Sequence, residues 1–391
     1  MSAIERVPLS TVCRQDRGAV RAGEFTELRY LGMESIEPGG GRLAQGQLAK
    51  VPETPEANTF RFTPGHVLYG KLRPYLNKVL APDFEGKCST ELIPLLPTER
   101  LDRRYLAYFL RAHTTVEAIS QKVAGARMPR ADMNFVMSLP IPLPPVKQQQ
   151  KVVEGLARAE NIVMMRRDAE QKAKEIIPAL FLDMFGDPAT NPKGYLIAPL
   201  GDLFAQKPNY GTMIPAKTEL LPWLCLRVAN IQDGRLTLKD RKYVSLPDVH
   251  VARHEIQAGD ILMARAIGSL EHLGKCVVAS PGAEKWAFDS HLMRVRLQGS
   301  RANPVWLQAL LSSEGGRRLF LEKTRRTAVQ FNINVGEMAA ILVPLPPIER
   351  QTEFEIRVQE LHQFEAQQVT ASALAAHVFQ SLLARVFGEP G

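Results

Sequence analysis

The strongest constraint on the fold is a stretch of 47 residues that occurs twice in the chain. The first copy opens with Pro-Leu-Pro-Pro at residues 142–145 and closes with Phe-Gly-Asp-Pro at residues 185–188. The second copy opens with the same motif at residues 344–347 and closes with Phe-Gly-Glu-Pro at residues 387–390. Every landmark is offset by 202 residues, with no insertion. A repeat kept in register over this length predicts one structural element that is used twice.

Each copy is predicted to be a long helix. The opening prolines cannot be helical, whereas the run that follows is rich in Gln, Lys, Glu, Ala and Leu. The closing Gly and Pro are typical of a helix end. Apolar residues recur at spacings of three and four, which is the pattern of a coiled-coil seam. The seam residues that we expect to pair the helices are Val152, Leu156, Val163, Ile177, Leu180, Phe354, Val358, Leu361, Phe379 and Leu382.

We expect the two helices to pack against each other in an antiparallel coiled coil. A helix with one apolar stripe must bury that stripe, and two copies in one chain give each helix a partner. Antiparallel pairing would also give the chain an internal pseudo-two-fold symmetry. The alternative is two unrelated surface helices on separate domains, but the constant offset between the copies favours pairing.

The segments outside the repeat are both predicted to be mostly β. Short β-forming runs are separated by Gly, Pro and Asn, and a helical run follows at residues 102–123 and again at residues 304–322. The sequence therefore predicts an α+β protein in four parts. These parts are a globular segment at 1–141, a Pro-rich junction and helix at 142–188, a second globular segment at 189–343, and a second junction and helix at 344–391.

Composition narrows the class of protein. The net charge of +8 and the pI of about 9.3 are compatible with an anionic partner. The four cysteines are too far apart for a zinc site or a disulfide framework, which favours reduced thiols in the cytoplasm. Neither a signal peptide nor an 18-residue apolar run is apparent in the sequence, so we expect no membrane association.

The search for catalytic motifs gives no candidate, which predicts a chain without enzymatic activity. A DNA amino-methyltransferase needs an Asn-Pro-Pro-Tyr-type loop, and residues 191–194 lack the second Pro and the aromatic residue. Residues 268–275 superficially resemble a phosphate-binding loop. They contain one residue too many between the glycines, and Cys276 stands where Ser or Thr should bind Mg²⁺. We therefore expect no metal or cofactor on this chain.

These motifs together resemble the specificity subunits of type I restriction–modification systems, over nearly the whole chain. The resemblance rests on Pro-Leu-Pro-Pro-x-x-x-Gln at the start of each helix and Phe-Gly-Asp/Glu-Pro at its end. It also rests on Leu-Arg-Pro-Tyr-Leu-Asn-Lys at residues 72–78 and on residues 330–334 before the second junction. The chain departs from the family pattern in having Pro178 in the first helix only. Before the first junction, Arg-Met-Pro-Arg at residues 127–130 replaces the Gln-containing turn.

The resemblance implies a DNA-recognition role. In this family the globular segments are target recognition domains, and each reads one half of a bipartite, asymmetric DNA target. The paired helices set the gap between the half-sites and dock two methyltransferase subunits, and restriction/translocase subunits join the complex for antiphage defence. S-adenosylmethionine would belong to the partner methyltransferase, and ATP and Mg²⁺ to the partner nuclease. This chain would be a non-catalytic, cytoplasmic subunit.

The candidate DNA-binding residues lie in loops rich in cations and amides, because Arg and Lys read guanine and Asn and Gln read adenine. In the first segment the candidates are Lys71, Arg73, Tyr75, Asn77, Lys78, Arg127 and Arg130. In the second segment they are Arg265, Ser269, His272, Arg325, Arg326, Gln330, Asn332 and Asn334, with Arg325 and Arg326 assigned to phosphates. The alternative for each cluster is a solvated, salt-bridged loop.

Two other function classes are compatible with parts of the sequence. A coiled-coil scaffold protein without DNA sequence specificity would explain the helices, although the loop cations argue against it. An undescribed hydrolase would explain a globular fold, but the absence of any nucleophile–base spacing argues against it more strongly.

Overall fold

A computed structural model describes residues 4–21, 28–44, 58–125, 127–232, 234–326 and 331–388, without the side chains of residues 325 and 326. The chain divides into two compact units. Unit 1 contains Met1–Asp168 and Val369–Gly391, and unit 2 contains Ala169–Gln368. Each unit therefore combines one of the predicted globular segments with part of both long helices.

The two copies of the repeat form the two longest helices, each of 40 residues: α4 (Val146–Phe185) and α9 (Ile348–Phe387). The Pro-rich motifs lie before them, as predicted from the missing N–H groups of proline. Gly186 follows α4 with a φ of 77°, a left-handed conformation that glycine adopts without strain. Helix α4 continues through Pro178. The predicted α+β class is confirmed.

Unit 1 contains two four-stranded sheets and two strand pairs. The first sheet has the order β2-β9-β6-β7 and the second the order β3-β5-β8-β4, while β1 pairs with β12 and β10 with β11. The strands are β1 (Arg6–Pro8), β2 (Cys13–Gln15), β3 (Ala19–Val20), β4 (Arg29–Leu31), β5 (Thr59–Phe62), β6 (Val67–Gly70), β7 (Val79–Leu80), β8 (Gly86–Ser89), β9 (Leu92–Pro97), β10 (Val123–Ala124), β11 (Arg130–Ala131) and β12 (Pro140–Pro142). Its further helices are η1 (Leu9–Thr11), η2 (Met33–Ser35), η3 (Pro74–Leu76), α1 (Arg103–Arg111), α2 (His113–Gln121) and α3 (Met133–Ser138).

Unit 2 follows a related plan. It has a four-stranded sheet in the order β14-β23-β19-β21, two three-stranded sheets (β18-β15-β22 and β20-β25-β24), and the pairs β13-β26 and β16-β17. Its strands are β13 (Leu196–Pro199), β14 (Asn209–Tyr210), β15 (Trp223–Leu226), β16 (Ile231–Gln232), β17 (Arg235–Leu236), β18 (Tyr243–Val244), β19 (Ile261–Ala264), β20 (Ala266–Ile267), β21 (Cys276–Val278), β22 (Trp286–Phe288), β23 (Leu292–Val295), β24 (Arg325–Arg326), β25 (Phe331–Asn332) and β26 (Leu342–Leu345). Its further helices are η4 (Leu200–Leu203), η5 (Val228–Asn230), α5 (Asp248–His254), α6 (Pro304–Ser312), α7 (Glu314–Glu322) and α8 (Val335–Ala339).

Each predicted helical run after the strands is in fact two helices. In unit 1, Ala112 is extended (φ −62°, ψ 137°) and lies between α1 and α2. In unit 2, Ser313 is extended (φ −67°, ψ 156°) between α6 and α7. The Ser313 hydroxyl accepts a hydrogen bond from the Gly316 N–H at 3.1 Å and so caps the second helix. Apolar periodicity missed the breaks because apolar residues recur on both sides of them, although the Ser and Gly residues at 312–316 are a break signal in unit 2.

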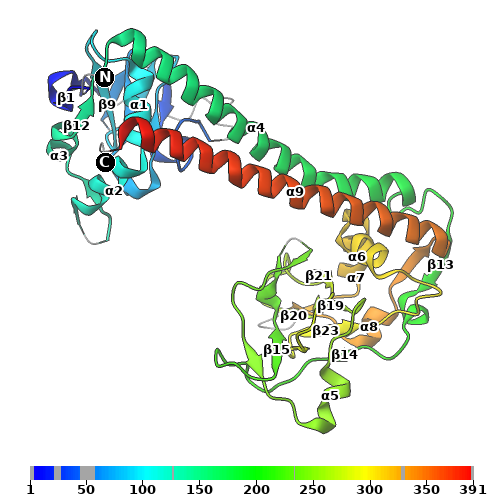
Figure 1. The fold of residues 1–391 in the computed structure, drawn as a ribbon. Helices are drawn as coiled ribbons and strands as arrows, with labels where there is room; N and C mark the ends of the chain where they lie inside the picture. Colours follow the sequence, from blue (N-terminus) through cyan, green and yellow to red (C-terminus); the bar gives the residue numbers. More distant parts are fainter. Residues whose placement is uncertain are drawn as a thin grey trace. The chain divides into compact units, whose positions relative to one another are not determined.

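Within each unit the segments of α4 and α9 run antiparallel and share the hydrophobic core (Figure 1). In unit 1 the first turns of α4, with Val153 and Leu156, join the last turns of α9, with Phe379 and Leu383, in one cluster. In unit 2 the Phe354 ring at the start of α9 lies 5.8 Å from that of Phe181 and 5.5 Å from that of Phe185, at the end of α4.

The predicted seam residues face these cores to different degrees. Leu156, Phe354, Val358 and Phe379 are buried, and the partly buried members are Val152, Val163, Ile177, Leu180, Leu361 and Leu382. Several buried helix residues were not in the predicted seam, among them Val153, Phe181, Phe185, Leu383 and Phe387. They are buried because each helix packs against strands and short helices of its unit as well as against the other long helix.

The end of α9 is an integral part of unit 1. The Phe387 ring lies 4.9 Å from the Tyr105 ring and 5.8 Å from the Phe109 ring, so it closes the core beside α1. The Arg6 guanidinium donates hydrogen bonds to the backbone carbonyls of Phe387 and Gly388. A cation at this position satisfies carbonyls that the helix end leaves without partners.

Candidate nucleic-acid interface

In unit 1 the structure brings the predicted cationic loop and the predicted basic turn together. The N–H of Arg73 donates to the carbonyl of Pro129 at 2.7 Å, and the N–H of Ala131 donates to the carbonyl of Lys71 at 2.8 Å. Leu72 and Arg130 face each other as an isolated antiparallel bridge. Two segments far apart in the sequence thus form one cationic edge, which carries Lys71, Arg73 and Arg130.

Glu91 organises part of this edge. Its carboxylate accepts hydrogen bonds from Arg130 Nε at 3.2 Å and from Arg130 Nη2 at 2.9 Å, and it lies 3.9 Å from Lys71 Nζ. Hydrogen bonding to Glu91, together with its charge, raises the pKa of Arg130. A surface ion pair of this kind adds little stability, but a bidentate contact fixes the plane of the guanidinium. Glu91 was not among the predicted residues, because an isolated acidic residue gave no signal in the sequence.

Four predicted side chains of this loop and turn are exposed, and one of them, Arg130, is the one paired with Glu91. Arg73 has a left-handed backbone (φ 50°) at the start of η3, and Tyr75 within η3 is 56% exposed. Arg127, on the basic turn, is also exposed. A guanidinium and a phenol can contact bases or phosphates from such a position.

Asn77 and Lys78 are instead used inside unit 1. The Asn77 amide donates to the carbonyl of Arg111 at 3.1 Å, and Lys78 Nζ donates to the carbonyl of Met33 at 2.6 Å. Asn77 also has a left-handed backbone, with a φ of 52°. These contacts give both residues a role in shaping the loop that carries Arg73 and Tyr75.

Unit 2 repeats the same juxtaposition with different residues. Ala266 pairs with Asn332 in the β20–β25 ladder, as Leu72 faces Arg130 in unit 1. The N–H of Ile333 donates to the carbonyl of Arg265 at 3.1 Å. The predicted residue Arg265, between β19 and β20, therefore lies next to β25, which carries the predicted residue Asn332. Arg325 is paired with Asn332 in the β24–β25 register, whereas the side chains of Arg325 and Arg326 and the whole of Gln330 lie outside the described residues.

The remaining predicted residues of unit 2 have different environments. Ser269 begins a turn in which its carbonyl accepts from the N–H of His272 at 3.2 Å, and His272 is exposed. Asn334 caps α8, because its side-chain oxygen accepts from the N–H of Glu337 at 2.9 Å. In turn, the Glu337 carboxylate accepts a hydrogen bond from the Asn334 N–H. The structure thus uses Asn334 to start a helix.

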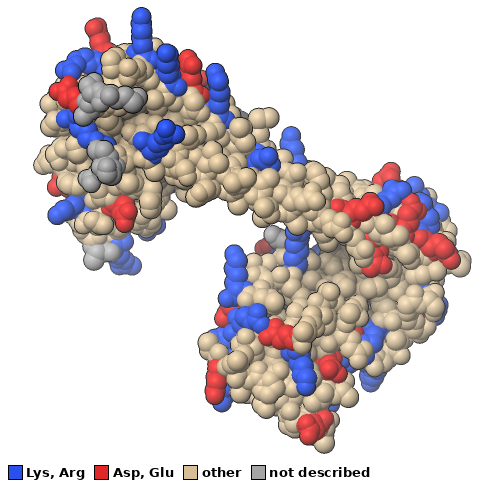
Figure 2. Space-filling model, in the orientation of Figure 1, with Lys and Arg blue, Asp and Glu red and all other residues tan. Residues whose placement is uncertain are grey.

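Charge alone does not mark the interface. On the face drawn in Figure 2, Lys and Arg side chains are interspersed with Asp and Glu over each unit. Specific loops therefore define the candidate surface better than the net charge does.

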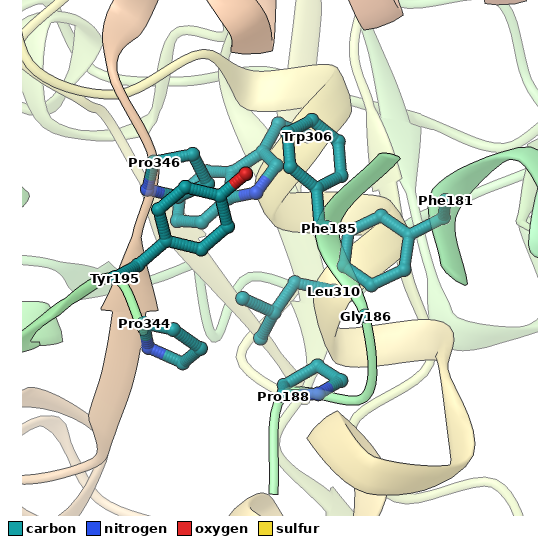
Figure 3. A pocket seen from close by; sticks show the side chains of 9 residues that line it. All are labelled: Phe181, Phe185, Gly186, Pro188, Tyr195, Trp306, Leu310, Pro344 and Pro346. Carbon is teal, nitrogen blue, oxygen red and sulfur yellow. The ribbon is translucent and has the colours of Figure 1, made fainter. Parts of the chain in front are cut away.

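The described residues offer little support for small-molecule or nucleophilic chemistry. A hollow in unit 2 beside the end of α4 is ringed by aromatic and proline side chains, including Phe185, Tyr195, Trp306 and Pro344 (Figure 3). Its volume of about 10 Å³ is room for roughly one water molecule. All four cysteines are free and buried, and burial raises the pKa of Cys13, Cys225 and Cys276 to about 12, so these thiols stay protonated at neutral pH.

Comparison with known proteins identifies the group of proteins to which this sequence and this fold are similar. Residues 53–173 match the family model of the type I restriction modification DNA specificity domain. The EcoKI specificity subunit of Escherichia coli (strain K12) is 25% identical over 317 residues, which is 75% of this chain and 66% of that protein. The StySPI specificity subunit of Salmonella potsdam is 24% identical over 313 residues, with the same shares. The match thus spans just under two thirds of the length of these relatives.

Solved structures give the same fold along the chain. A chain of a type I R-M system, from work on its complex assembly and conformational transition, has a TM-score of 0.64 at 19% identity, covering 98% of this chain and 97% of that one. The S subunit from M. genitalium has a TM-score of 0.55 at 13% identity, covering 100% and 98%.

The fold thus defines a class of two-unit α+β proteins built on a duplicated long helix. Within that class, the resemblance predicted from the motifs is confirmed: the chain is similar in sequence and in fold to the type I restriction–modification specificity subunits.

One expectation needs correction. By length and hydropathy, α9 could cross a membrane, with an 18-residue window of mean hydropathy 1.2, although the sequence was expected to contain no such stretch. Core helices of soluble proteins can have the same length and hydropathy. Within unit 1 the last turns of α9 pack on the domain core through Phe379, Leu383 and Phe387.

Proposed function

We propose that this chain is the DNA sequence-specificity subunit of a type I restriction–modification complex. One observation carries the proposal. In each unit, a loop that follows a buried strand lies next to a turn that precedes a long helix, and the two units present different side chains at this place. Unit 1 presents Arg73, Tyr75 and Arg127, whereas unit 2 presents Arg265 and Asn332. Two domains that share a fold but present different side chains suit a bipartite, asymmetric target, because each domain can bind a different half of it.

The long helices would set the gap between the half-sites. A continuous α-helix resists bending far better than a Gly/Ser-rich linker, and each helix here has 40 residues. Exposed apolar residues support a docking role for these helices in addition. In unit 1 they include Met165 on α4 and Leu374 on α9, which are 72% and 63% exposed, and in unit 2 they include Phe364 on α9, which is 52% exposed. Within each unit, a contiguous patch of such side chains would suit a protein-binding surface.

In this proposal the helices dock two methyltransferase subunits, and restriction/translocase subunits complete the complex in the cytoplasm. S-adenosylmethionine would be bound by the methyltransferase, and ATP and Mg²⁺ by the translocase. The chain itself would contribute recognition and no catalytic group.

The test is DNA binding by the chain in complex with its methyltransferase partner, measured across salt concentrations, together with mapping of methylated sites in the source genome. We expect a two-part methylated sequence and binding that weakens steeply with salt. Partner binding without any sequence preference would support the coiled-coil scaffold instead. Turnover of a substrate by the isolated chain would support a hydrolase.

A further inference from the structure

Arg265 has an unusually well-defined position at the end of a buried strand in unit 2. It directly follows β19, all four residues of which are buried. Its N–H donates to the carbonyl of His291 at 3.0 Å, and its own carbonyl accepts from the N–H of Ile333 at 3.1 Å. The backbone of Arg265 is therefore held from both sides.

The side chain of Arg265 is held as well. Its Nε donates to the carbonyl of Ser290 at 2.9 Å, and the centre of its guanidinium lies 4.0 Å from the centroid of the Tyr210 ring. A guanidinium at this distance from an aromatic face is attracted by the ring, which limits the positions that the arginine side chain can take.

Tyr210 is itself fixed. It lies on β14, opposite Met293 of β23, and is partly buried against the core of the unit. Its hydroxyl oxygen accepts a hydrogen bond from the N–H of Val335, the first residue of α8, at 3.3 Å. The ring therefore connects the central sheet, the start of α8 and Arg265.

These contacts leave the far end of the guanidinium available. Within the described part of the chain, neither Nη atom of Arg265 has a hydrogen-bonding partner. Two parallel donors at the end of a planar fork match the O6 and N7 acceptors on the major-groove edge of guanine. An arginine ordered before binding also loses less side-chain entropy when it contacts a base.

We propose that Tyr210 is a positioning residue that holds Arg265 to read a guanine in the half-site bound by unit 2. The inference rests on the proposed function. It adds the residue that contacts the base, the residue that positions it, and the identity of the base. Asn332, across the β20–β25 ladder from Ala266, would lie beside this contact.

The experiment uses the complete complex with its methyltransferase subunits. An exchange of residues 189–343 first shows which half-site belongs to unit 2. The affinity is then measured for the native target and for targets in which each guanine of that half is replaced in turn. The variants are Tyr210→Leu, Tyr210→Phe and Arg265→Lys. The matched control is Tyr243→Leu, because Tyr243 is also partly buried in unit 2 and lies 5.9 Å from the guanidinium of Arg241.

We expect Tyr210→Leu to reduce discrimination at one guanine by about 5- to 100-fold, the range that one bidentate base contact supplies. Tyr210→Phe should retain most of the discrimination, because it keeps the ring and loses only the hydroxyl. Arg265→Lys should lose the same discrimination as Tyr210→Leu, because an ammonium cannot form the two parallel bonds. Tyr243→Leu should leave discrimination at that guanine unchanged.

Three results would overturn the inference. One is unchanged discrimination at every guanine in Tyr210→Leu and Arg265→Lys. Another is a uniform loss of affinity on all DNA, which would mean a phosphate contact or a purely structural role. The third is an equal loss in Tyr243→Leu. Should Tyr210→Leu unfold, Arg265→Lys still tests the reading of guanine, and Tyr210→Phe tests the support, because a loss in Tyr210→Phe as large as in Arg265→Lys would contradict positioning by the ring. If the wild-type complex showed no two-part target, the proposed function itself would fail, which is a distinguishable outcome.

Discussion

Gln149 and Asp102 are joined by a hydrogen bond of 2.8 Å, in which the Asp102 N–H donates to the Gln149 side-chain oxygen. The Gln149 amide also donates to the carbonyls of Arg100 and Pro144, at 2.9 and 2.8 Å. Asp102 is the N-cap of α1, so Gln149 connects the start of α4 to the start of a core helix. In unit 2, Gln351 makes the same contacts with Asn303, Arg301 and Pro346.

Replacing Gln149 or Gln351 with Ala should destabilise its own unit. Each side chain is fully buried, and its loss leaves backbone groups without partners, at a cost of about 1–3 kcal/mol per group. For a unit of this size the unfolding midpoint should fall by roughly 2–4 °C per kcal/mol, measured by calorimetry. Gln150→Ala is the control, because Gln150 is exposed on the same helix. An equal shift in the control variant would contradict the role of these contacts.

Replacing Lys71 and Arg73 with Ala should relax the preference for one half-site and leave the other half-site unchanged. Both residues lie on the cationic edge of unit 1, and each base contact accounts for about 1–3 kcal/mol of discrimination. Binding to targets mutated in either half measures the effect. Arg14→Ala is the control, since Arg14 is 72% exposed and paired with Asp16 in the same unit. Equal weakening on every sequence would indicate phosphate contacts alone.

Exchanging residues 189–343 for the corresponding segment of a relative should change one half of the target and preserve the other. The reason is that this segment carries both Arg265 and Asn332, together with the strands β20 and β25 that bring them side by side. Methylation mapping of cells that express the chimera gives the result. A methylation pattern identical to that of the parent would refute modular reading.

Inserting one heptad into both long helices should lengthen the permitted gap between the half-sites. Seven residues extend a helix by about 10 Å, which corresponds to roughly 3 base pairs at about 3.4 Å per step, and a heptad preserves the phase of the apolar seam. Binding to a series of targets with different gaps measures the preferred gap. A control that replaces exposed helix residues without changing the length should leave it unchanged. A gap that stayed constant in the lengthened protein would exclude the helices as a spacer.

The stability of unit 2 should fall as the pH drops below about 6.5, with His254 contributing. Burial, followed by the charge of Arg253, lowers the pKa of His254 below its usual value of about 6.5. The unfolded chain therefore takes up a proton at a pH where the folded protein does not, which favours unfolding. The contribution of neutral His254 to the stability of unit 2 is complete above about pH 6.5 and decreases as the pH falls towards the lowered pKa of His254.

Urea unfolding at pH 7.5 and pH 5.5 measures this effect. His254→Gln should show a smaller loss of stability between the two values than the wild type does. His113→Gln serves as the control, because the His113 side chain is 80% exposed. His362, whose pKa is also lowered by burial, accounts for part of the remaining dependence. An unchanged pH dependence in His254→Gln would contradict the assignment.

The sequence predicted the parts of the fold that depend on local pattern. The helix ends at Pro145 and Gly186 follow from backbone chemistry, and Leu156 and Phe354 follow from the apolar spacing. The break at Ala112 could not be predicted, because alanine is the best helix former and only the tertiary packing of α1 and α2 ends the helix there.

The candidate surface was only partly predictable for a similar reason. Composition located the loops that carry Arg73 and Arg265, but not the residues that organise them. Tyr210 lies 55 residues before Arg265, and Glu91 lies 39 residues before Arg130, so sheet pairing rather than sequence proximity brings each pair together. Asn77 and Asn334 show the converse, because residues of a type that reads adenine are engaged in a loop contact and a helix cap.

The position of Phe387 and Arg6 in one corner of unit 1 has a consequence for biosynthesis. Unit 2 is continuous in sequence, so all of its residues are synthesised before the second segment of unit 1, Val369–Gly391. Unit 1 begins first but must wait for the last turns of α9 to cover Tyr105 and Phe109. A ribosome that stopped before α9 was complete would thus release a chain whose first-made half stays open, with apolar core surface accessible to chaperones and proteases.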